Sequence, residues 1–369
     1  MVQAGVRPDR IGSYSVDDVV FLLRDISKYQ LEIKTEEREA LIQSGTHYSE
    51  MLPMEYQPDE QYISLFHRTL NHYSKRIAIA IGVVAEQIKE KRGLNNLVLV
   101  SLARAGTPIG VLVKRYFKAI HRVEIPHYSI SIIRGRGIDE TAIDYIFAHH
   151  AAADIQFIDG WTGKGAITKE LKGACQKYNA AHSNQLNASL AVLADPGYCV
   201  DIYGTREDFL IPSACLNSTV SGLVSRTVWN ESFMEKGDFH GAKFYRELKE
   251  VDVSNLYVDC IAAEFAHAIE GIQQRLVELA NEDQTPSWKG AQSVERIQEI
   301  FSIKNSNFVK PGVGETTRVL LRRVPWKILI NPYYSNDLTH ILLLAKDKNV
   351  QVEEFADMSY SCCGIIKEL

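Results

Sequence analysis

The chain has 369 residues, of which 46% are hydrophobic and 24% charged, and its formal net charge is -5. This composition is typical of a globular protein of two or three domains. The net negative charge excludes a nucleic-acid-binding coat over the whole surface but leaves room for a local basic patch. Because no window has the pattern of a signal peptide or a long apolar run, we expect a cytoplasmic protein that has no membrane partner.

Three helices are predicted before residue 95. A polar cap at Ser15 and a stripe of apolar residues predict a helix over 15–27, and a second follows at about 33–43. A longer helix is expected over about 60–91, ending at Gly93. These helices form an N-terminal extension to whatever fold follows.

Apolar strands alternate with helices in the middle of the chain. Strands are predicted at 97–102, 127–133, 155–158 and 189–195, and helices at 109–120, 141–150 and 166–178. This alternation predicts an α/β fold with a parallel sheet covered by helices on both faces. Ligands of such sheets bind at the carboxyl ends of the strands.

The last third of the chain changes composition. Helices are predicted at about 256–281 and 291–302. Residues 304–330 then carry six basic side chains and one acid, a net charge of +5 in an otherwise acidic chain. We therefore divide the chain into a main domain with a hood (1–255), a helical connector (256–303) and a C-terminal domain (304–369).

The six cysteines form no C-x-x-C pair and have no histidines at zinc-finger spacing. We expect reduced, mostly buried thiols. Cys362 and Cys363 are adjacent, which suits neither a disulfide nor a standard zinc site.

The segment FIDGWTGKG (157–165) has the form of an anion site. It places an aspartate, Asp159, after a strand and a glycine-rich turn before a helix. Backbone N–H groups in such a turn, with a helix N-terminus behind them, bind phosphate. The spacing matches neither a Walker A loop nor a dinucleotide turn. A carboxylate beside the turn suits a sugar phosphate, because it can accept hydrogen bonds from ribose hydroxyls.

This segment resembles the 5-phosphoribosyl-diphosphate (PRPP) motif of type I phosphoribosyltransferases. SLARAGTPIG (101–110) resembles their diphosphate loop, and SIIRGRGIDE (131–140) stands where they carry a mobile catalytic loop. The resemblance implies a type I phosphoribosyltransferase-like parallel sheet with a helical N-terminal extension and a small C-terminal α/β/α domain. It further implies transfer of a phosphoribosyl group to a nucleobase-like acceptor, or the reverse reaction.

The resemblance assigns roles to individual residues. Arg104 would hold the diphosphate, Arg134 and Arg136 would close over it, and Asp159 would hold the ribose hydroxyls. Mg²⁺ would be bound through the diphosphate and not directly by the protein. The other implied PRPP ligands are Ala105, Gly106, Thr107, Thr162, Gly163, Lys164, Gly165 and Ala166. The chain departs from the usual motif at Gly160, where a second acid is expected, and at Lys164, where a small residue is common.

A closer resemblance is carried by GSYSVDDVVFLL, HYSEMLPMEY, DGWTGKGAITKEL and DFHGAKFYREL. These segments are similar to bacterial phosphoribosyltransferase-like proteins of tellurite-resistance and stress-response clusters, which are also named the StiP "cysteine protease" family. The resemblance implies a nucleoside-like metabolite made under stress.

Two interpretations of the polar segments stay open. As a transferase, the chain would line an acceptor pocket with His240, Lys243 and Tyr245, and His47 and Tyr48 are weaker candidates. As a cysteine protease, it would need Cys215 to meet His240, because the nucleophile is a thiolate activated by an imidazole. The sequence does not show whether these two residues lie together.

The C-terminal domain resembles the Pelota-type RNA-binding domain. A G-x-N-E-type loop opens a helix in that family, and here Gly314 replaces the asparagine. Structured RNA is therefore an expected partner, with phosphates neutralised by basic side chains. The implied RNA contacts are Gly312, Gly314, Glu315, Thr316, Arg318, Arg322 and Arg323. The alternatives are a domain that only packs against the enzyme or a partner chain, and an RNA-binding scaffold whose transferase site is inactive. A homodimer is left open.

Overall fold

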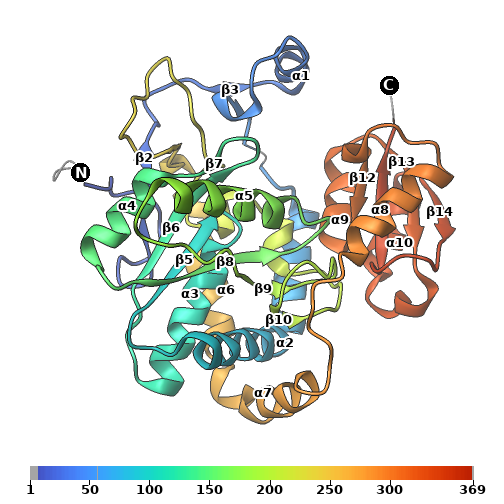
Figure 1. Cartoon of the computed structure of the whole chain (residues 1–369). Helices are drawn as coiled ribbons and strands as arrows, with labels where there is room; N and C mark the ends of the chain where they lie inside the picture. The colour runs from blue at the N-terminus through green and yellow to red at the C-terminus, as the bar shows by residue number, and fades with distance from the viewer. Residues whose placement is uncertain (1–6, 56, 368–369) are drawn as a thin grey trace.

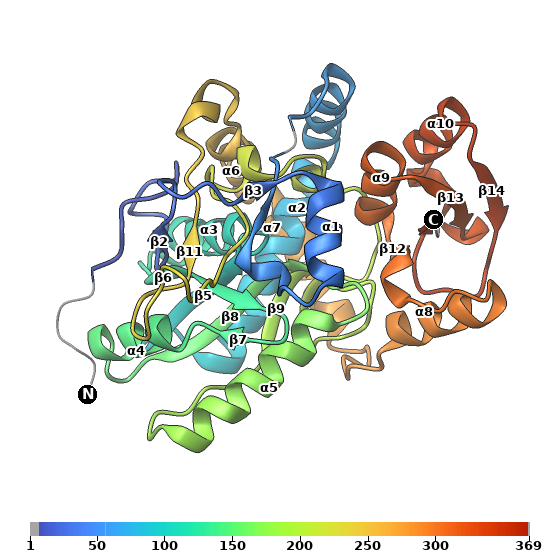
Figure 2. The same cartoon turned by 90° about the horizontal axis from the view of Figure 1, so that it is seen from above.

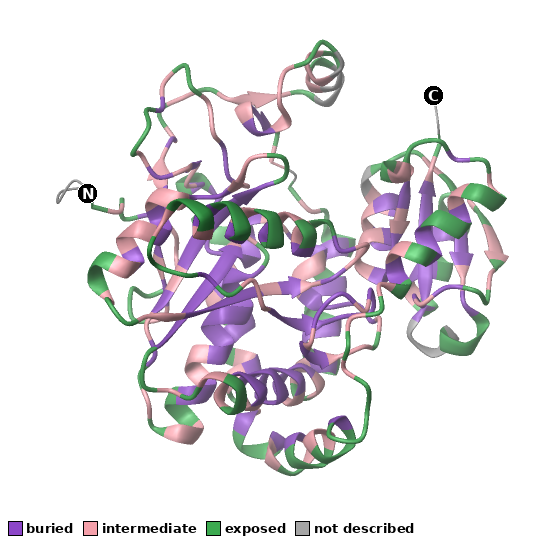
Figure 3. Ribbon diagram, in the orientation of Figure 1, coloured by how far each residue is buried: buried purple, intermediate pink, exposed green. Residues whose placement is uncertain are grey.

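The computed structural model describes residues 7–55 and 57–367. Its centre is a sheet of six parallel strands in the order β1-β6-β5-β8-β9-β10 (Figure 1). Their bounds are Val20–Phe21 (β1), Leu97–Ala103 (β5), His127–Ile133 (β6), Asp154–Trp161 (β8), Leu190–Ala194 (β9) and Ile202–Thr205 (β10). The strands are largely buried (Figure 3), as apolar runs of a two-sided sheet require. The predicted α/β fold with a parallel sheet is confirmed.

Helices cover both faces of this sheet (Figure 2). Helices α4 (Glu140–His149) and α5 (Ala166–Ala181) lie on one face. Helices α2, α3, α6 and α7 pack together on the other face, with bounds Glu60–Arg92, Thr107–Tyr116, Ser254–Ala262 and Phe265–Leu279. The helix expected over 256–281 is therefore two helices, interrupted between residues 262 and 265.

The helix predicted over 15–27 is wrong. This segment forms β1, which pairs with β6, and β2 (Arg24–Asp25), which pairs with β11 (Gly241–Ala242). Its apolar side chains are buried on successive residues, with Phe21, Leu22 and Leu23 each 4% exposed or less. Pairing with a sheet edge buries both faces of the segment, a gain that a surface helix could not match.

The N-terminal extension joins residues 223–245 to form a hood above the carboxyl ends of the strands (Figure 1). It contains α1 (Thr35–Gln43) and a second small sheet of β3 (Glu32–Ile33) and β4 (Leu52–Pro53). The hood is thus built from two segments far apart in sequence.

The C-terminal domain has a mixed sheet in the order β12-β15-β13-β14. The strand bounds are Val309–Pro311 (β12), Pro325–Ile330 (β13), Gln351–Glu354 (β14) and Cys362–Ile366 (β15). Helix α8 (Lys289–Ile300) covers one face, and α9 (Val313–Arg322) and α10 (Thr339–Asp347) cover the other. The expected α/β/α layering is present.

Burial in this domain explains the adjacent cysteines. Cys363 packs with α8, whereas Cys362 packs on the side of α9, because successive residues of a strand face opposite ways. Since α8 contributes Val294 and Ile297 to the core of this sheet, we place the domain boundary before α8 and not at residue 303.

Candidate functional site

The chain reverses its direction of winding between β5 and β8, the position where ligands of open α/β sheets bind. Two glycines lie in close backbone contact at this point, and the contact of Gly106 leaves no room for a Cβ. A Cβ on Gly106 would lie 2.4 Å from the carbonyl oxygen of Ile158, and one on Gly160 would lie 3.3 Å from that of Ala105. The turn after β5 therefore packs directly on the end of β8.

Asp159 lies inside β8, paired with Val192, because the strand continues to Trp161. Its Oδ1 accepts a hydrogen bond from the Gly160 amide N–H at 2.7 Å. Among the described residues it forms no ion pair. Burial raises its pKa to about 7. A carboxylate in this setting gains from any hydroxyl or cation that a ligand brings.

The phosphate loop, residues 162–165, leads into α5. Gly165 has a φ of +77° and caps α5 without a side-chain hydrogen bond. A Cβ there would lie 2.3 Å from Trp288, so only glycine fits. Ala166 is exposed at the helix start. The start of α5 thus has no side-chain cap, a feature that suits the predicted anion site.

Thr162 anchors the phosphate loop. Its hydroxyl donates to the buried carboxylate of Asp195, at the end of β9, and its amide donates to Ala194. Asp195 also pairs with Arg206 at 3.0 Å. The Thr162 hydroxyl therefore holds the loop in place. The sequence predicted Thr162 as a PRPP ligand, but its hydroxyl is not directed to a phosphate.

The turn after β5 presents only part of its expected ligand set. The Gly106 amide donates to Leu102, and the Thr107 hydroxyl is 2.8 Å from that of Ser129, so both are directed inward. Ala105 is exposed. The Arg104 guanidinium donates to the Val224 carbonyl at 3.2 Å. It therefore sits at the site but is tethered to the hood.

Glu55 is a further neighbour of Arg104, at 3.8 Å. It also accepts hydrogen bonds from the amide and hydroxyl of Ser218, at 2.9 and 2.6 Å. This carboxylate holds the guanidinium in place and would compete with an incoming phosphate for it.

A cavity of about 180 Å³ opens at this edge of the sheet. Arg104, Ala105, Gly160 and Trp161 line it from the main domain, and Arg318 of α9 lines it from the C-terminal domain. The cavity is thus completed by the second domain.

The expected mobile loop is a short, anchored hairpin. The turn joins β6 to β7 (Gly137–Ile138), which pairs antiparallel with it. The amides of Gly135 and Gly137 donate to the Glu170 carboxylate at 2.8 and 3.0 Å. These contacts tie the turn to α5 in this conformation, and the flexibility expected of the glycine-hinged loop stays a prediction.

The two arginines of the hairpin have different settings. Arg136 pairs with Glu50 and donates to the Trp229 carbonyl at 2.9 Å, so it is committed to the hood. Arg134 is exposed, and its guanidinium lies 5.6 Å from the centre of the Tyr48 ring. Only Arg134 keeps its charge available to a ligand.

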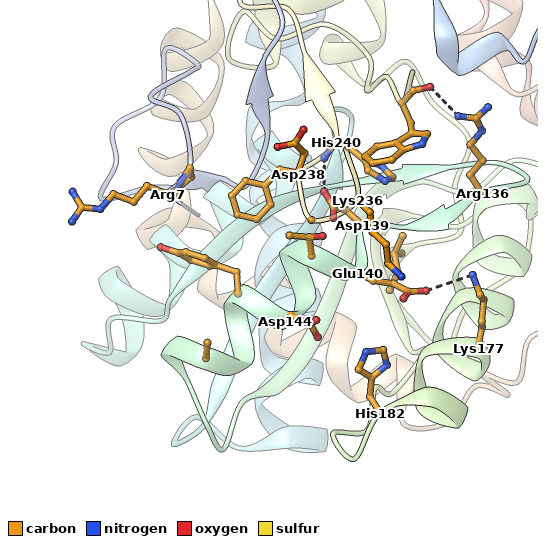
Figure 4. A pocket seen from close by; sticks show the side chains of 18 of the residues that line it. Arg7, Arg136, Asp139, Glu140, Asp144, Lys177, His182, Lys236, Asp238 and His240 are labelled. Carbon is orange, nitrogen blue, oxygen red and sulfur yellow. Dashed lines mark hydrogen bonds and ion pairs between the residues drawn. The ribbon is translucent and has the colours of Figure 1, made fainter. Parts of the chain in front are cut away.

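The expected acceptor residues do not share one pocket. His240 lines a cavity of about 1720 Å³ together with Arg136, Asp139 and Trp229 (Figure 4). Its ring is 2.8 Å from the Ser131 hydroxyl, and burial lowers its pKa.

Lys243 and Tyr245 lie elsewhere in the hood. Lys243 pairs with Glu32 at 2.7 Å, and Tyr245 is 2% exposed. Of the weaker candidates, Tyr48 accepts the Arg134 amide, and His47 is hydrogen-bonded to Ser49. Of the three expected acceptor residues, His240 therefore lines a pocket, whereas Lys243 and Tyr245 stabilise the hood.

The cysteines lack the setting of a nucleophile. Cys215 is 0% exposed, in the turn 212–215 between α2 and α9. Burial raises the pKa of Cys175, Cys199 and Cys363 to about 12. The described contacts of His240 are with Ser131, Asp139 and Trp229.

The C-terminal domain docks beside the phosphate loop. Lys164 donates to the carbonyl of Ser306 and, at 3.5 Å, to that of Val309. A Cβ on Gly312 would lie 2.8 Å from the Trp161 ring. The two domains thus meet at the loop that was expected to bind the 5′-phosphate.

The predicted RNA loop faces this junction. Asp208, after β10, accepts the Val313 amide through Oδ1 and the Ser361 amide through Oδ2, both at 2.9 Å. Gly312 and Thr316 are buried. The N-terminus of α9 is therefore capped by the main domain, and these two residues are not available to RNA.

The remaining expected RNA contacts are divided. A Cβ on Gly314 would lie 3.0 Å from the Cβ of Ala214, so this glycine packs against the main domain. Glu315 pairs with Arg318 at 3.0 Å. Arg318 also donates to the Ala214 carbonyl. Arg323 is exposed, and the side chain of Arg322 lies outside those described.

Glu55, Glu170 and Asp208 were not anticipated. Each acts on a segment distant in sequence, so no local pattern marks it. Asp195 had a signal, since it is an acid at the carboxyl end of a predicted strand.

Comparison with solved structures gives a weak similarity. A hypoxanthine phosphoribosyltransferase from Trypanosoma cruzi, in complex with the product IMP, is 14% identical and covers 49% of this chain and 93% of its own, with a TM-score of 0.23. The fold described above rests on the strand order of the sheet. No described helix is both long and apolar enough to cross a membrane.

Sequence comparisons are stronger. Residues 288–368 match the PELOTA RNA binding domain, which begins at α8. "Cysteine protease StiP" of Acinetobacter baylyi is 33% identical over 377 residues, covering 97% of this chain and 94% of that protein. Residues 12–262 match the family described as tellurite-like stress resistance cysteine protease StiP. The chain therefore belongs to the StiP family and carries a C-terminal PELOTA domain.

Proposed function

We propose that the protein is a PRPP-dependent phosphoribosyltransferase, or catalyses the reverse reaction, with a nucleobase-like acceptor. The observation that supports this proposal is the position of Asp159, which comes shortly before the uncapped N-terminus of α5 in the chain. A carboxylate for ribose hydroxyls lies directly before an uncapped anion site, at the point where the sheet changes direction.

The chemistry would follow from these groups. The bond from C1 of the ribose to the diphosphate breaks while a bond from C1 to the acceptor nitrogen forms. The ring carries positive charge between these events, and the nearby Asp159 carboxylate would stabilise it. Arg104 would hold the departing diphosphate after exchanging Glu55 for it.

Mg²⁺ would be carried to this site by the diphosphate. The described residues contain no group of three or more side chains that could hold a metal ion. Asp159 is the acid placed to face a diphosphate-bound ion, whose role would be to neutralise the charge of the leaving group.

Thermal unfolding tests this proposal. PRPP with Mg²⁺ should raise the melting temperature, since a ligand that binds only the folded state stabilises it. Asp159→Ala and Gly163→Trp should abolish the rise, while Asp347→Ala, exposed on α10, should keep it. Equal responses in all variants would place PRPP elsewhere.

The family description supports a second candidate, a cysteine protease. A protease would need Cys215 to become exposed, because it is fully buried here. We expect Cys215→Ser to leave PRPP binding and diphosphate release intact, and Arg104→Ala to weaken both. Cleavage of an unfolded protein that is lost in Cys215→Ser but kept in Arg104→Ala would favour the protease.

RNA is the macromolecular partner that we propose, on the support of the PELOTA match. We also propose that the reaction makes a nucleoside-like metabolite under stress, a role that the family's description supports.

A further inference from the structure

Basic side chains from both domains gather where the phosphate loop meets β12. Lys164 reaches out of the phosphate loop to the carbonyls of Ser306 and Val309. The next residue, Lys310, is carried by β12 itself. Arg134 projects from the hairpin, which Glu170 ties to α5, the helix that follows the phosphate loop. We call Arg134, Lys164, Lys310 and Arg323 the junction cluster.

Lys164 lies beside the strand that carries Lys310, because its ammonium donates to the carbonyl of Val309, the residue before Lys310. Burial, and then the charges of Lys310 and Arg134, lower the pKa of Lys164 to about 8. Burial lowers the pKa of Lys310 as well, with further contributions from Arg323 and Arg134. The four cations thus form one electrostatic group that spans two domains.

Acids do not neutralise this group. Among the described ion pairs none involves Arg134, Lys164, Lys310 or Arg323. Glu315 is the acid that acts on both lysines, and it is paired with Arg318 at 3.0 Å. Lys164 and Lys310 are half-buried and have no ion-pair partner among the described residues, so a bound anion would offset the cost of burying their charges.

We propose that the junction cluster binds backbone phosphates of single-stranded RNA, and so brings an RNA strand to the edge of the phosphate loop. Single-stranded nucleic acid is held by positively charged grooves that follow its backbone, and this cluster runs from one domain to the other. The N-terminus of α9 is closed by Asp208, which removes the predicted loop as the place of contact. The proposal rests on the RNA partner proposed above and gives it a binding site, and it does not require the transferase activity.

The salt dependence of RNA binding by the full chain tests this site. The probe is a short oligouridylate, and the main variant is Lys310→Ala with Arg323→Ala. These side chains make no described hydrogen bond, so folding should be kept. Each lost phosphate contact lowers the log–log salt slope by about 0.7, so the double variant should lower it by about 1.4. Lys164→Ala should lower it by a further unit of the same size.

Lys348→Ala is the matched control, because Lys348 is exposed at the end of α10 in the same domain. It should leave the slope unchanged. An unchanged slope in the double variant, or an equal loss in Lys348→Ala, would overturn the proposal. A competition experiment distinguishes RNA from a free phosphate ion as the ligand. If inorganic phosphate protects Lys164 and Lys310 from acetylation but oligouridylate does not, the cluster is a small-anion site and the RNA proposal fails.

The transferase proposal can fail separately. Asp159→Ala should abolish the thermal response to PRPP without weakening oligouridylate binding. The junction variants could lose both oligouridylate binding and the thermal response to PRPP. If Asp159→Ala then loses only the response to PRPP, RNA binding at the junction is still supported. RNA binding with no PRPP response in any variant would refute the transferase alone.

Discussion

Replacing Asp159 by asparagine should stabilise the protein above neutral pH. The half-buried carboxyl has a pKa of about 7, against an ordinary value of 3.8. Each pKa unit corresponds to about 1.4 kcal/mol, so ionising Asp159 costs the folded state up to about 4 kcal/mol. Asparagine has nearly the same shape, keeps an oxygen to accept the Gly160 amide, and carries no charge.

The sign of this effect follows from proton binding. Asp159 binds its proton more tightly in the folded than in the unfolded chain, so protonation stabilises the fold. This contribution is complete below about pH 4 and is lost as pH rises toward 7. The variant should therefore match the wild type near pH 4 and exceed it above pH 7, by roughly 2 to 4 kcal/mol.

Urea unfolding at several pH values between 4 and 8.5 measures this difference directly, because all other titrating groups are shared. Asp347→Asn, exposed on α10, controls for the removal of one negative charge. Parallel stability curves for the wild type and Asp159→Asn would show that the carboxylate is not desolvated. The gain in stability should accompany loss of the PRPP response, as expected when a binding site holds an uncompensated group.

Three further predictions concern contacts that hold the site together. Glu170→Ala should speed amide hydrogen exchange at Gly135 and Gly137 by roughly tenfold or more, because two charge-assisted hydrogen bonds are lost; Glu299→Ala, exposed on α8, should leave it unchanged. Asp208→Ala should lower the unfolding free energy by about 2 kcal/mol or more, since the Val313 and Ser361 amides lose their acceptor. It should also expose residues 281–288 to proteolysis. An unaltered digestion pattern would contradict the capping role of Asp208. Oligouridylate affinity should fall as pH rises through about 8, where Lys164, facing Lys310, Arg134, Cys363 and Glu315, loses its proton; Lys164→Arg should remove this pH dependence, and a dependence that persists would assign it to another group.

The sequence by itself determined the parallel sheet and the position of the phosphate loop. Local signals were sufficient there, because each central strand is a continuous apolar run and each following helix is amphipathic. The sequence also predicted the order of Asp159, the glycine-rich loop with Gly165 and the following helix, although Asp159 lies inside β8 and not after it. Their roles depend on backbone conformation and chain order, which are local properties.

Residues 15–27 show where local signals fail. Their apolar pattern suits a helix or a strand buried on both faces, and only the free edge of β6 decides between them. The hairpin at 134–137 has two glycines and two arginines, which favour mobility, but Glu170 of α5 holds it in place. Neither outcome is encoded within the segment concerned.

Tertiary structure alone decided the part played by the second domain. The sequence indicated an RNA-binding loop at 312–316, but Asp208 caps the helix that begins there, and Gly312 and Thr316 are buried. The same docking places Arg318 in the cavity beside Arg104, and Lys310 beside Lys164. These pairs are separated by more than a hundred residues, so the contacts depend on how two folded surfaces fit, a property that no short stretch of sequence records.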